Sequence, residues 1–375
     1  MENGSSKPMR KYEVEVWWRN RTKVGEIGRL LNSFKWTESR NGVGSIDFNI
    51  DQGVLSDYCQ KIGEDPAVLL QLKNTDIKLK RYGKYRIGGF VNDFPDINFN
   101  QGNTTVSVSC DGYLNLLADQ LITDTRRYTQ QHTADIASDL IRYACAKSGS
   151  TLDITISNAN YYATQVRRDW TYDNKQNIKD AVVNLTSLGD GSNDFDFRFT
   201  PFREWESYDI NNPVVHDMTV IYPAPAKASN RQAGATSMSM KLVSSMANYI
   251  IARGSGQGDT TLVVTTSDAE SIAQYGIHES VLDYSDISVR ETLLQHAEAE
   301  LAVKKLPIFL PQPKVNGAEF DVGSIHAGEV IRVINNKSPW FKVDGMYRIE
   351  EMVVSVNSEG SEEVDLTLSS LGVRQ

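Results

Sequence analysis

Apolar and polar residues alternate over the first part of the chain with the period of two that a strand buried on one face produces. Every second side chain is apolar in three separate runs, 13–17, 45–50 and 106–110. Turn-forming residues such as Asn41-Gly42 separate these runs. This pattern is typical of antiparallel sheets, and short strands in close succession favour a small β-barrel over residues 11–112.

The spacing of apolar residues changes to three and four over residues 113–235, as in amphipathic helices. Helices are predicted in three stretches, 113–122, 133–148 and 174–188. Thr133 is a suitable N-cap for the second helix, and Gly149 follows its end. With a short aromatic strand at 195–199, the region is expected to form a mixed α+β domain.

Strand patterning returns at 249–253 and again from residue 308 onward. Two helices are predicted between these stretches, each preceded by a Ser-x-x-Glu capping box, Ser267 with Glu270 and Ser288 with Glu291. We therefore expect a second barrel formed by residues 236–258 and 305–375, with a helical insertion over 259–304. The predicted fold class is α+β and mainly β, with two similar small antiparallel barrels.

An internal repeat links the two predicted barrels. At an offset of 262 residues, from Gly83 to Gly345, both copies read Gly-x-Tyr-Arg-Ile. The apolar residues at 68–74 align with 330–336 at the same offset. Two generic hairpins could agree by chance, but the shared setting favours a duplication. We expect residues 11–112 to superpose on the second barrel, with Leu72 on Ile334 and Tyr85 on Tyr347.

Composition and charge narrow the functional classes. The 39 basic and 48 acidic residues give a net charge of −9, which disfavours sequence-independent binding of nucleic acid. The three cysteines are far apart and odd in number, so neither a disulfide framework nor a zinc site is expected. No apolar run is long enough to span a membrane as a helix. Residues 1–10 are polar and are expected to be a disordered tail without a secretory signal.

Candidate catalytic motifs are not found in the sequence. No two histidines have metal-ligand spacing, and His278-Glu279 lacks the second histidine of a zincin. The glycines at 254–258 precede a strand rather than a helix, so a hairpin turn is predicted instead of a phosphate loop. The acidic stretch 190–196 is better explained as a solvated turn than as a calcium site. We expect no enzymatic activity, no cofactor and no metal.

Several segments resemble a signature of phage tail hub proteins, which are also called minor tail proteins in long-tailed phages. They are Ala-Arg-Gly-x-Gly-x-Gly at 252–258, Asp-Ala-x-Ser-Ile-Ala-x-Tyr-Gly-x-x-Glu at 268–279, Ala-x-Ala-x-Leu-Ala at 297–302, and 320–330. In the last segment the family often has Leu-Gly-Asp, whereas this chain has Val322-Gly323-Ser324. The matching motifs cover the last third of the chain, and the order of predicted domains extends the likeness over most of it.

The resemblance implies a structural protein of the virion, similar in plan to the hub of contractile-tail baseplates. Such a hub is a homotrimer whose six barrels surround the DNA ejection channel and connect the six-fold tail tube to the tip or fibres. Its implied partners are the tube or distal tail protein and the tip or fibre proteins, with assembly in the host cytoplasm. Pairing of open strand edges between neighbouring barrels would complete the ring. A host-binding adhesin that recognises carbohydrate through exposed tryptophans remains an alternative, and a cell-wall hydrolase of the tail tip is a weaker one.

A hub channel lined with acidic groups would repel DNA evenly and let it pass, whereas a basic lining would retain it through phosphate contacts. The net charge is consistent with such a lining, although acidity also serves solubility. Polar-face positions with carboxylates are the candidates for the channel lining: Asp47, Asp51, Glu329, Glu359, Glu362, Glu363 and Asp365.

Overall fold

The computed structural model describes residues 11–371, except 20, 101–102, 165–166, 173–174, 187–194, 227–228, 243–245, 257, 285–286, 308 and 338–342. The predicted N-terminal tail, the acidic loop up to residue 194 and Trp340 lie outside the described residues. The chain forms two compact units, residues 1–237 with 313–367 and residues 238–312 with 368–375. The boundaries between these units fall inside strands β15, β19 and β22.

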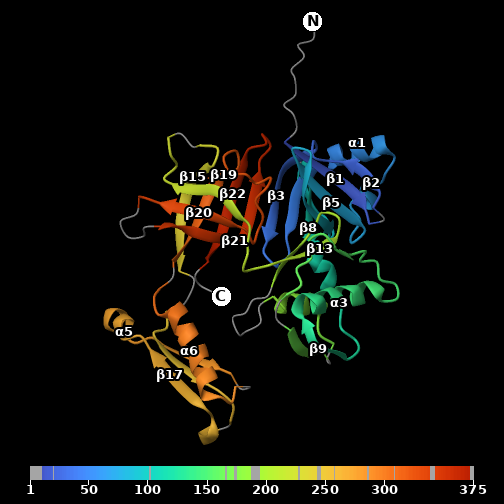
Figure 1. The fold of residues 1–375 in the computed structure, drawn as a ribbon. Coiled ribbons are helices and arrows are strands. Elements are labelled where there is room, and N and C mark those ends of the chain that lie inside the picture. The colour runs from blue at the N-terminus through green and yellow to red at the C-terminus, as the bar shows by residue number, and fades with distance from the viewer. Residues whose placement is uncertain are drawn as a thin grey trace. The chain divides into compact units, whose positions relative to one another are not determined.

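The predicted class, α+β and mainly β, is confirmed. A 14-stranded sheet contains the strands of both predicted barrels (Figure 1), and those of the first form an open path in its strand order. The strands of the first barrel are β1 (Tyr12–Trp18), β2 (Lys23–Glu26), β3 (Leu31–Ser39), β4 (Ser45–Asp51), β5 (Thr75–Arg81), β6 (Lys84–Val91), β7 (Asp96–Asn100) and β8 (Asn103–Gly112). Their spatial order is β2-β1-β5-β6-β8-β4-β3, and β7 pairs with β8. Tyr12 of β1 packs edge-on against Phe34 of β3, with 5.0 Å between the ring centroids.

The second barrel closes on itself through six strands, in the order β21-β20-β14-β15-β19-β22 and back to β21. These strands are β14 (Val215–Tyr222), β15 (Gln232–Leu242), β19 (Phe309–Asn316), β20 (Val330–Asn335), β21 (Val343–Val356) and β22 (Glu362–Ser370). Strand β14 is the exception to the antiparallel pattern, because it runs parallel to both β15 and β20.

A ladder between β3 and β21 joins the two barrels into one sheet, and the two strands lie side by side in Figure 1. Residues 34–39 pair antiparallel with residues 351–356. Side chains on one face, such as Phe34, Trp36 and Val354, are buried in the barrel cores. The alternation that predicted half-buried strands therefore also fixes which face of this shared sheet is open to solvent.

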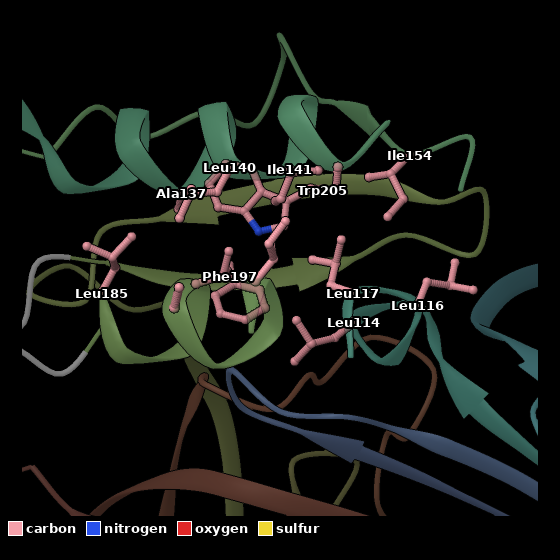
Figure 2. Close-up of a cluster of buried hydrophobic side chains, with 14 of the residues drawn as sticks. Leu114, Leu116, Leu117, Ala137, Leu140, Ile141, Ile154, Leu185, Phe197 and Trp205 are labelled. Carbon is pink, nitrogen blue, oxygen red and sulfur yellow. The ribbon is translucent and has the colours of Figure 1, made fainter. Parts of the chain in front are cut away.

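The mixed domain lies between the two barrels in sequence. Its elements are η1 (Tyr113–Leu117), β9 (Arg126–His132), α3 (Thr133–Ala146), β10 (Thr155–Ile156), β11 (Arg167–Tyr172), α4 (Ile178–Asn184), β12 (Asp196–Phe199) and β13 (Glu204–Tyr208). Figure 2 shows that Leu140 and Ile141 of α3 point toward Trp205 of β13 and Phe197 of β12. The side chains recur at helical spacing on α3, so one face of the helix supplies the core.

The second compact unit contains a three-stranded sheet in the order β17-β16-β18. Its elements are β16 (Tyr249–Arg253), η2 (Gly258–Thr260), β17 (Val263–Ser267), α5 (Ala269–Tyr275), β18 (Glu279–Asp283) and α6 (Arg290–Lys304). Helix α6 packs on this sheet through Leu293, Ala297 and Leu301, which belong to the same buried cluster as Ile250. The glycines after β16 precede an antiparallel partner, as the predicted hairpin requires.

These pairings correct the predicted domain boundaries. Residues 236–258 were assigned to the second barrel, but β16 pairs with β17 and β18 of the separate sheet. The strands that complete the second barrel are instead β14 and β15, most of which had been placed in the mixed domain. A strand's sequence shows that it needs partners but does not say which ones, because the period of two is the same in either sheet.

Local predictions also need correction. The first barrel contains helices α1 (Gln52–Ile62) and α2 (Pro66–Leu69), which the strand pattern did not predict. The predicted capping boxes are wrong: Asp268 caps α5 by accepting from the Ser271 N–H, and the N-cap Val289 of α6 makes no side-chain cap. Asp268 and Val289, each one position after a predicted serine, have the extended backbone of an N-cap residue, so the serines lie outside the caps.

The duplication is supported by strand order rather than by the ungapped alignment, and β14 departs from it in direction, since it is parallel to β20 whereas β1 is antiparallel to β5. In chain order, β1, β3, β4, β5, β6 and β8 occupy the same places in the first sheet as β14, β15, β19, β20, β21 and β22 in the second. The predicted match of Leu72 with Ile334 is wrong, because Leu72 lies in a turn and Ile334 in β20. A tight turn joins β5 to β6, whereas a longer loop joins β20 to β21, so one gap is needed. The superposition of Tyr85 on Tyr347 stays a prediction.

Candidate functional site

The open face of the shared sheet carries small polar side chains across β8, β4, β3 and β21. Ser355, Lys35, Asp47 and Ser109 form one row across these strands. Neighbouring rows contain Thr37, Ser45 and Asp111, and Ser33, Asn49 and Ser107. Because β3 pairs with β21, this polar face continues from the first barrel onto the second.

A groove of about 790 Å³ opens on this face. It is lined by β3, β4 and β8 of the first barrel, by the segment around Asp93 and Phe94, and by β21, β22 and their connecting turn. Four carboxylates that are not fully buried lie along it, Asp47, Asp93, Asp96 and Glu363, together with one cation, Lys35. The groove is therefore acidic and hydroxyl-rich.

Asp47 is held on this face by hydroxyl donors. Ser109 Oγ donates to its carboxylate at 2.7 Å, and Ser45 Oγ donates at 3.0 Å. Lys35 Nζ lies 4.0 Å away, and both side chains are more than a third exposed. Water and salt screen a pair of this kind, so Asp47 keeps most of its negative field toward solvent.

Two predicted channel residues have other roles. Glu362 has no exposed side-chain area and binds Arg81 Nε at 2.9 Å and Lys11 Nζ at 2.6 Å. Burial raises the pKa of Glu362, but hydrogen bonds from Arg81 and Lys11 outweigh it and hold the pKa below its ordinary value. Glu329 accepts from the His326 N–H at 2.8 Å and contacts His216 Nε2 at 2.5 Å. Glu362 is therefore paired within the chain although it borders the groove, Glu329 is hydrogen-bonded within the chain, and a channel-lining role for either residue stays a prediction.

The remaining candidates are closer to solvent. Asp51 caps α1 by accepting from the Val54 N–H at 3.0 Å. Glu359 is exposed in the turn between β21 and β22. Glu363 and Asp365 share Lys314, at 2.8 and 3.3 Å from its Nζ. Of the predicted set, the structure brings Asp47, Glu362 and Glu363 together on the groove, where the side chain of Glu362 is buried.

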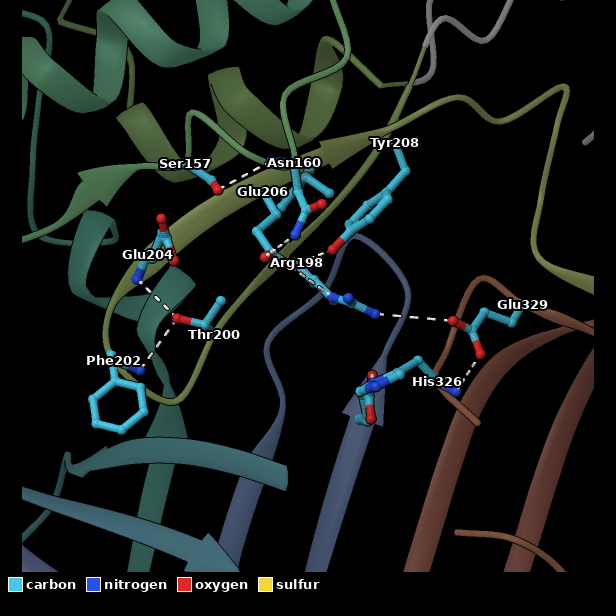
Figure 3. A network of polar contacts seen from close by, with 12 residues as sticks. Ser157, Asn160, Arg198, Thr200, Phe202, Glu204, Glu206, Tyr208, His326 and Glu329 are labelled. Carbon is cyan, nitrogen blue, oxygen red and sulfur yellow. Dashed lines mark hydrogen bonds and ion pairs between the residues drawn. The ribbon is translucent and has the colours of Figure 1, made fainter. Parts of the chain in front are cut away.

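A buried polar network lies beneath the junction of the barrels and the mixed domain, and Figure 3 shows part of it. Arg198 of β12 binds Glu206 Oε2 at 3.0 Å and extends toward Glu329, 3.9 Å away. Arg86 Nη2 donates to Glu38 at 2.7 Å, and His326 Nδ1 lies 2.8 Å from the same carboxylate. Burial raises the pKa of Glu38, but Arg86 and His326 outweigh it and lower the pKa to about 2.

The two arginines of the internal repeat are both buried and both join different parts of the fold. Arg86 links β6 to Glu38 of β3 and to the Ile325 carbonyl before β20. Arg348 links β21 to Asp196 of β12 at 3.0 Å and to the Ile210 carbonyl. The sequence predictions do not include these linking roles, although the duplicated Tyr-Arg-Ile marks both arginines.

Metal ligands, thiols and tryptophans are the groups that could serve catalysis or sugar binding. Within the described ranges, no group of three or more His, Cys, Asp or Glu could hold a metal ion. Cys59 and Cys110 are buried, and burial raises the pKa of both thiols, which makes thiolates scarce. Trp36 and Trp205 are fully buried, so neither can serve as an exposed platform for a sugar. No described helix is both long and apolar enough to cross a membrane.

Solved structures of tail and secretion-system proteins resemble this one over most of their length. A tail protein from Neisseria meningitidis matches with a TM-score of 0.66 at 13% identity, covering 97% of this chain and 98% of that one. The 43 kDa tail protein of prophage MuSo2 from Shewanella oneidensis matches with a TM-score of 0.67 at 11% identity, covering 95% and 97%. An E. coli component of the type VI secretion system, described as similar to T4 tail proteins, matches with a TM-score of 0.53 at 12% identity, covering 92% and 75%.

This chain has the fold of phage tail proteins. No protein-family profile and no curated protein sequence matches it. The resemblance drawn from the sequence motifs is thus confirmed at the level of the fold, which the whole chain shares with these tail proteins.

Proposed function

We propose that the chain is a structural protein of a phage tail, a homotrimeric hub at the distal end of the tail. The observation that carries this proposal is the pair of barrels with one strand order in a single chain. Three such chains supply six similar barrels, which is what a three-fold ring needs to meet a six-fold tube. The likeness to tail proteins over the whole length supports the same role.

The proposal assigns the polar face of the shared sheet to the channel. Its side chains are short and hydrophilic, and Asp47 and Glu363 give its groove a negative field. With one cation, Lys35, beside four carboxylates, a surface of this kind offers DNA few phosphate contacts. The hub would let DNA pass without binding it, and its lasting partners would be the tube protein and the tip or fibre proteins. No enzymatic step is part of the proposal.

The hub proposal is tested by the oligomeric state of the purified chain and by the shape of the oligomer. Sedimentation of the purified chain should give a trimer, and electron microscopy should show a ring with an axial hole. We expect each neighbouring pair to bury more than about 2,000 Å², as permanent interfaces do. A chain that remains monomeric at every soluble concentration, or a trimer without a hole, would contradict the hub.

A further inference from the structure

The two barrels within one chain are joined by a long strand that takes part in both. Strand β21 pairs with β20 over residues 343–348. Its second half, residues 351–356, then pairs with β3 of the other barrel. One long strand therefore serves both its own barrel and the neighbouring one.

In the first barrel, β6 and β7 take the places of the two halves of β21. The edge of β7 that corresponds to the β3-facing half of β21 has no partner strand among the described residues. By strand order, β6 and β7 together correspond to β21, and β15 corresponds to β3. Strand β6 pairs with β5, and β7 resumes along the same edge of β8, since Val91 faces Cys110 and Asp96 faces Ser107. Among the described residues, no strand pairs with the other edge of β7.

The side chains of β7 are those of an interface rather than of a free hairpin. Phe94 just before it is 75% exposed, and Ile97 and Phe99 are 47% and 77% exposed. Every β7 residue whose side chain is described is exposed, so neither face of the strand is covered. An uncovered edge strand with apolar side chains is a site for pairing with another chain.

Strand β15 offers a surface that complements β7. One edge of β15 pairs with β19, and in the described part of the chain its other edge pairs with β14 over Gln232–Gly234. Its later residues include Met238 and Met240, which are half-buried, and Leu242, which is 53% exposed. Lys241 is exposed on this strand, opposite in charge to Asp93 and Asp96 beside the apolar residues of β7.

We propose that β7 of one copy pairs antiparallel with residues 237–242 of β15 in the next copy of this chain. The contact repeats between chains the ladder that β21 and β3 form within a chain, so intrachain and interchain junctions alternate around the ring. The inference rests on the proposed function, because it names the strands through which the ring closes. Its apolar contribution comes from Ile97 and Phe99 against the methionines of β15.

Cross-linking tests the pairing. Asn98→Cys on β7 is combined in turn with Ser237→Cys, Ser239→Cys or Lys241→Cys on β15. We expect at least one combination to give a covalent trimer on a non-reducing gel. The matching single variants, mixed one to one, should give only covalent dimers, because each chain then carries one half of the contact. The native cysteines serve as the background, measured in the chain without substitutions.

A second measurement separates this inference from the hub itself. Ile97→Asp with Phe99→Asp should weaken assembly at least tenfold and leave the circular dichroism spectrum unchanged. Val263→Asp with Val281→Asp is the matched control, since these side chains are 42% and 51% exposed on β17 and β18 of the other sheet. If the wild type assembles into a ring, but the double variant assembles equally well and no cysteine pair cross-links, the strand pairing is wrong while the hub stands. If the wild type never assembles, both fail.

Discussion

We expect a buried ion pair to contribute more to the stability of this protein than an exposed pair does. Arg203 of the mixed domain and Asp76 of β5 form a two-bond pair, 2.6 and 3.0 Å long, with side chains only 3% and 5% exposed. Arg203 also donates to the Leu152 carbonyl at 2.8 Å. The pair therefore joins the mixed domain to the first barrel at a point that water does not reach.

Removing one partner should leave an uncompensated buried charge. Arg203→Met is expected to lower the free energy of unfolding by about 3–5 kcal/mol. Arg231→Met is the control, because Arg231 and its partner Asp217 are 74% and 75% exposed, and its effect should stay under about 1 kcal/mol. Urea denaturation of both variants measures the difference. Equal effects would show that the buried pair contributes no more than a surface pair.

Glu38 should make the fold sensitive to acid. Arg86 and His326 hold its pKa at about 2 in the folded chain, below the ordinary value of 4.5, against the opposing effect of burial. Its stabilising contribution is complete above pH 4.5 and is lost as the pH falls toward 2. Glu38→Gln should therefore be less stable at neutral pH and should show a flatter loss of stability between these two values. Unfolding curves at a series of pH values provide the check, and unchanged slopes would contradict it.

At the scale of elements, the N-cap of α5 lies one residue after the predicted position. Ser267 was expected to cap α5, but the strand β17 includes Ser267, and the turn into the helix occurs at Asp268. Asp268 accepts from the Ser271 N–H at 2.9 Å and also binds Lys305 Nζ at 2.9 Å. The choice between adjacent candidates was made by the pairing of β17 with β16, which ends the strand there.

Asp268→Ala should lower the melting temperature of the unit that contains α5, because an N–H of its first turn loses its acceptor. Ser267→Ala should leave the melting temperature unchanged, since the serine is exposed and outside the cap. Calorimetry of the two variants compares neighbouring positions directly. A larger effect at Ser267 would restore the capping box.

At the scale of the whole molecule, the shared sheet converts a local alternation into a continuous surface. The ladder between β3 and β21 aligns the polar faces of two barrels, so that Asp47 and Glu363, far apart in the sequence, lie on one groove. Neither residue is distinctive by itself. Their common position is what gives the proposed channel its acidic character.

Reversing these charges should turn an acidic groove that repels DNA into a surface that binds it. Asp47→Lys with Glu363→Lys is expected to make the assembled ring retain duplex DNA, with an affinity that falls as salt is added. Asp217→Lys, on an exposed side chain outside the groove, is a control with half the charge change. Gel mobility of DNA with each ring measures the effect. Equal DNA binding by the groove variant and the Asp217 variant would place the groove away from the DNA path.

The sequence by itself determined the periodic features of this protein. Alternation in 13–17, 45–50 and 106–110 was enough to predict strands with one buried face, because a period of two leaves no other arrangement. The helical spacing around Leu140 predicted α3, and the repeated Tyr-Arg-Ile indicated that one barrel design occurs twice. Each of these features is visible in short stretches of neighbouring residues.

Only the tertiary structure decided which strands pair and which charges remain exposed. The strand at 249–253 joins a separate sheet, and β14 and β15 close the second barrel instead, although each alternates in the same way. Glu362 and Glu363 are neighbours in sequence, yet one is buried against Arg81 and the other is exposed on the groove. The Glu362 pair depends on a partner 281 residues away, and the sheet assignment depends on a choice among strands that local periodicity does not distinguish.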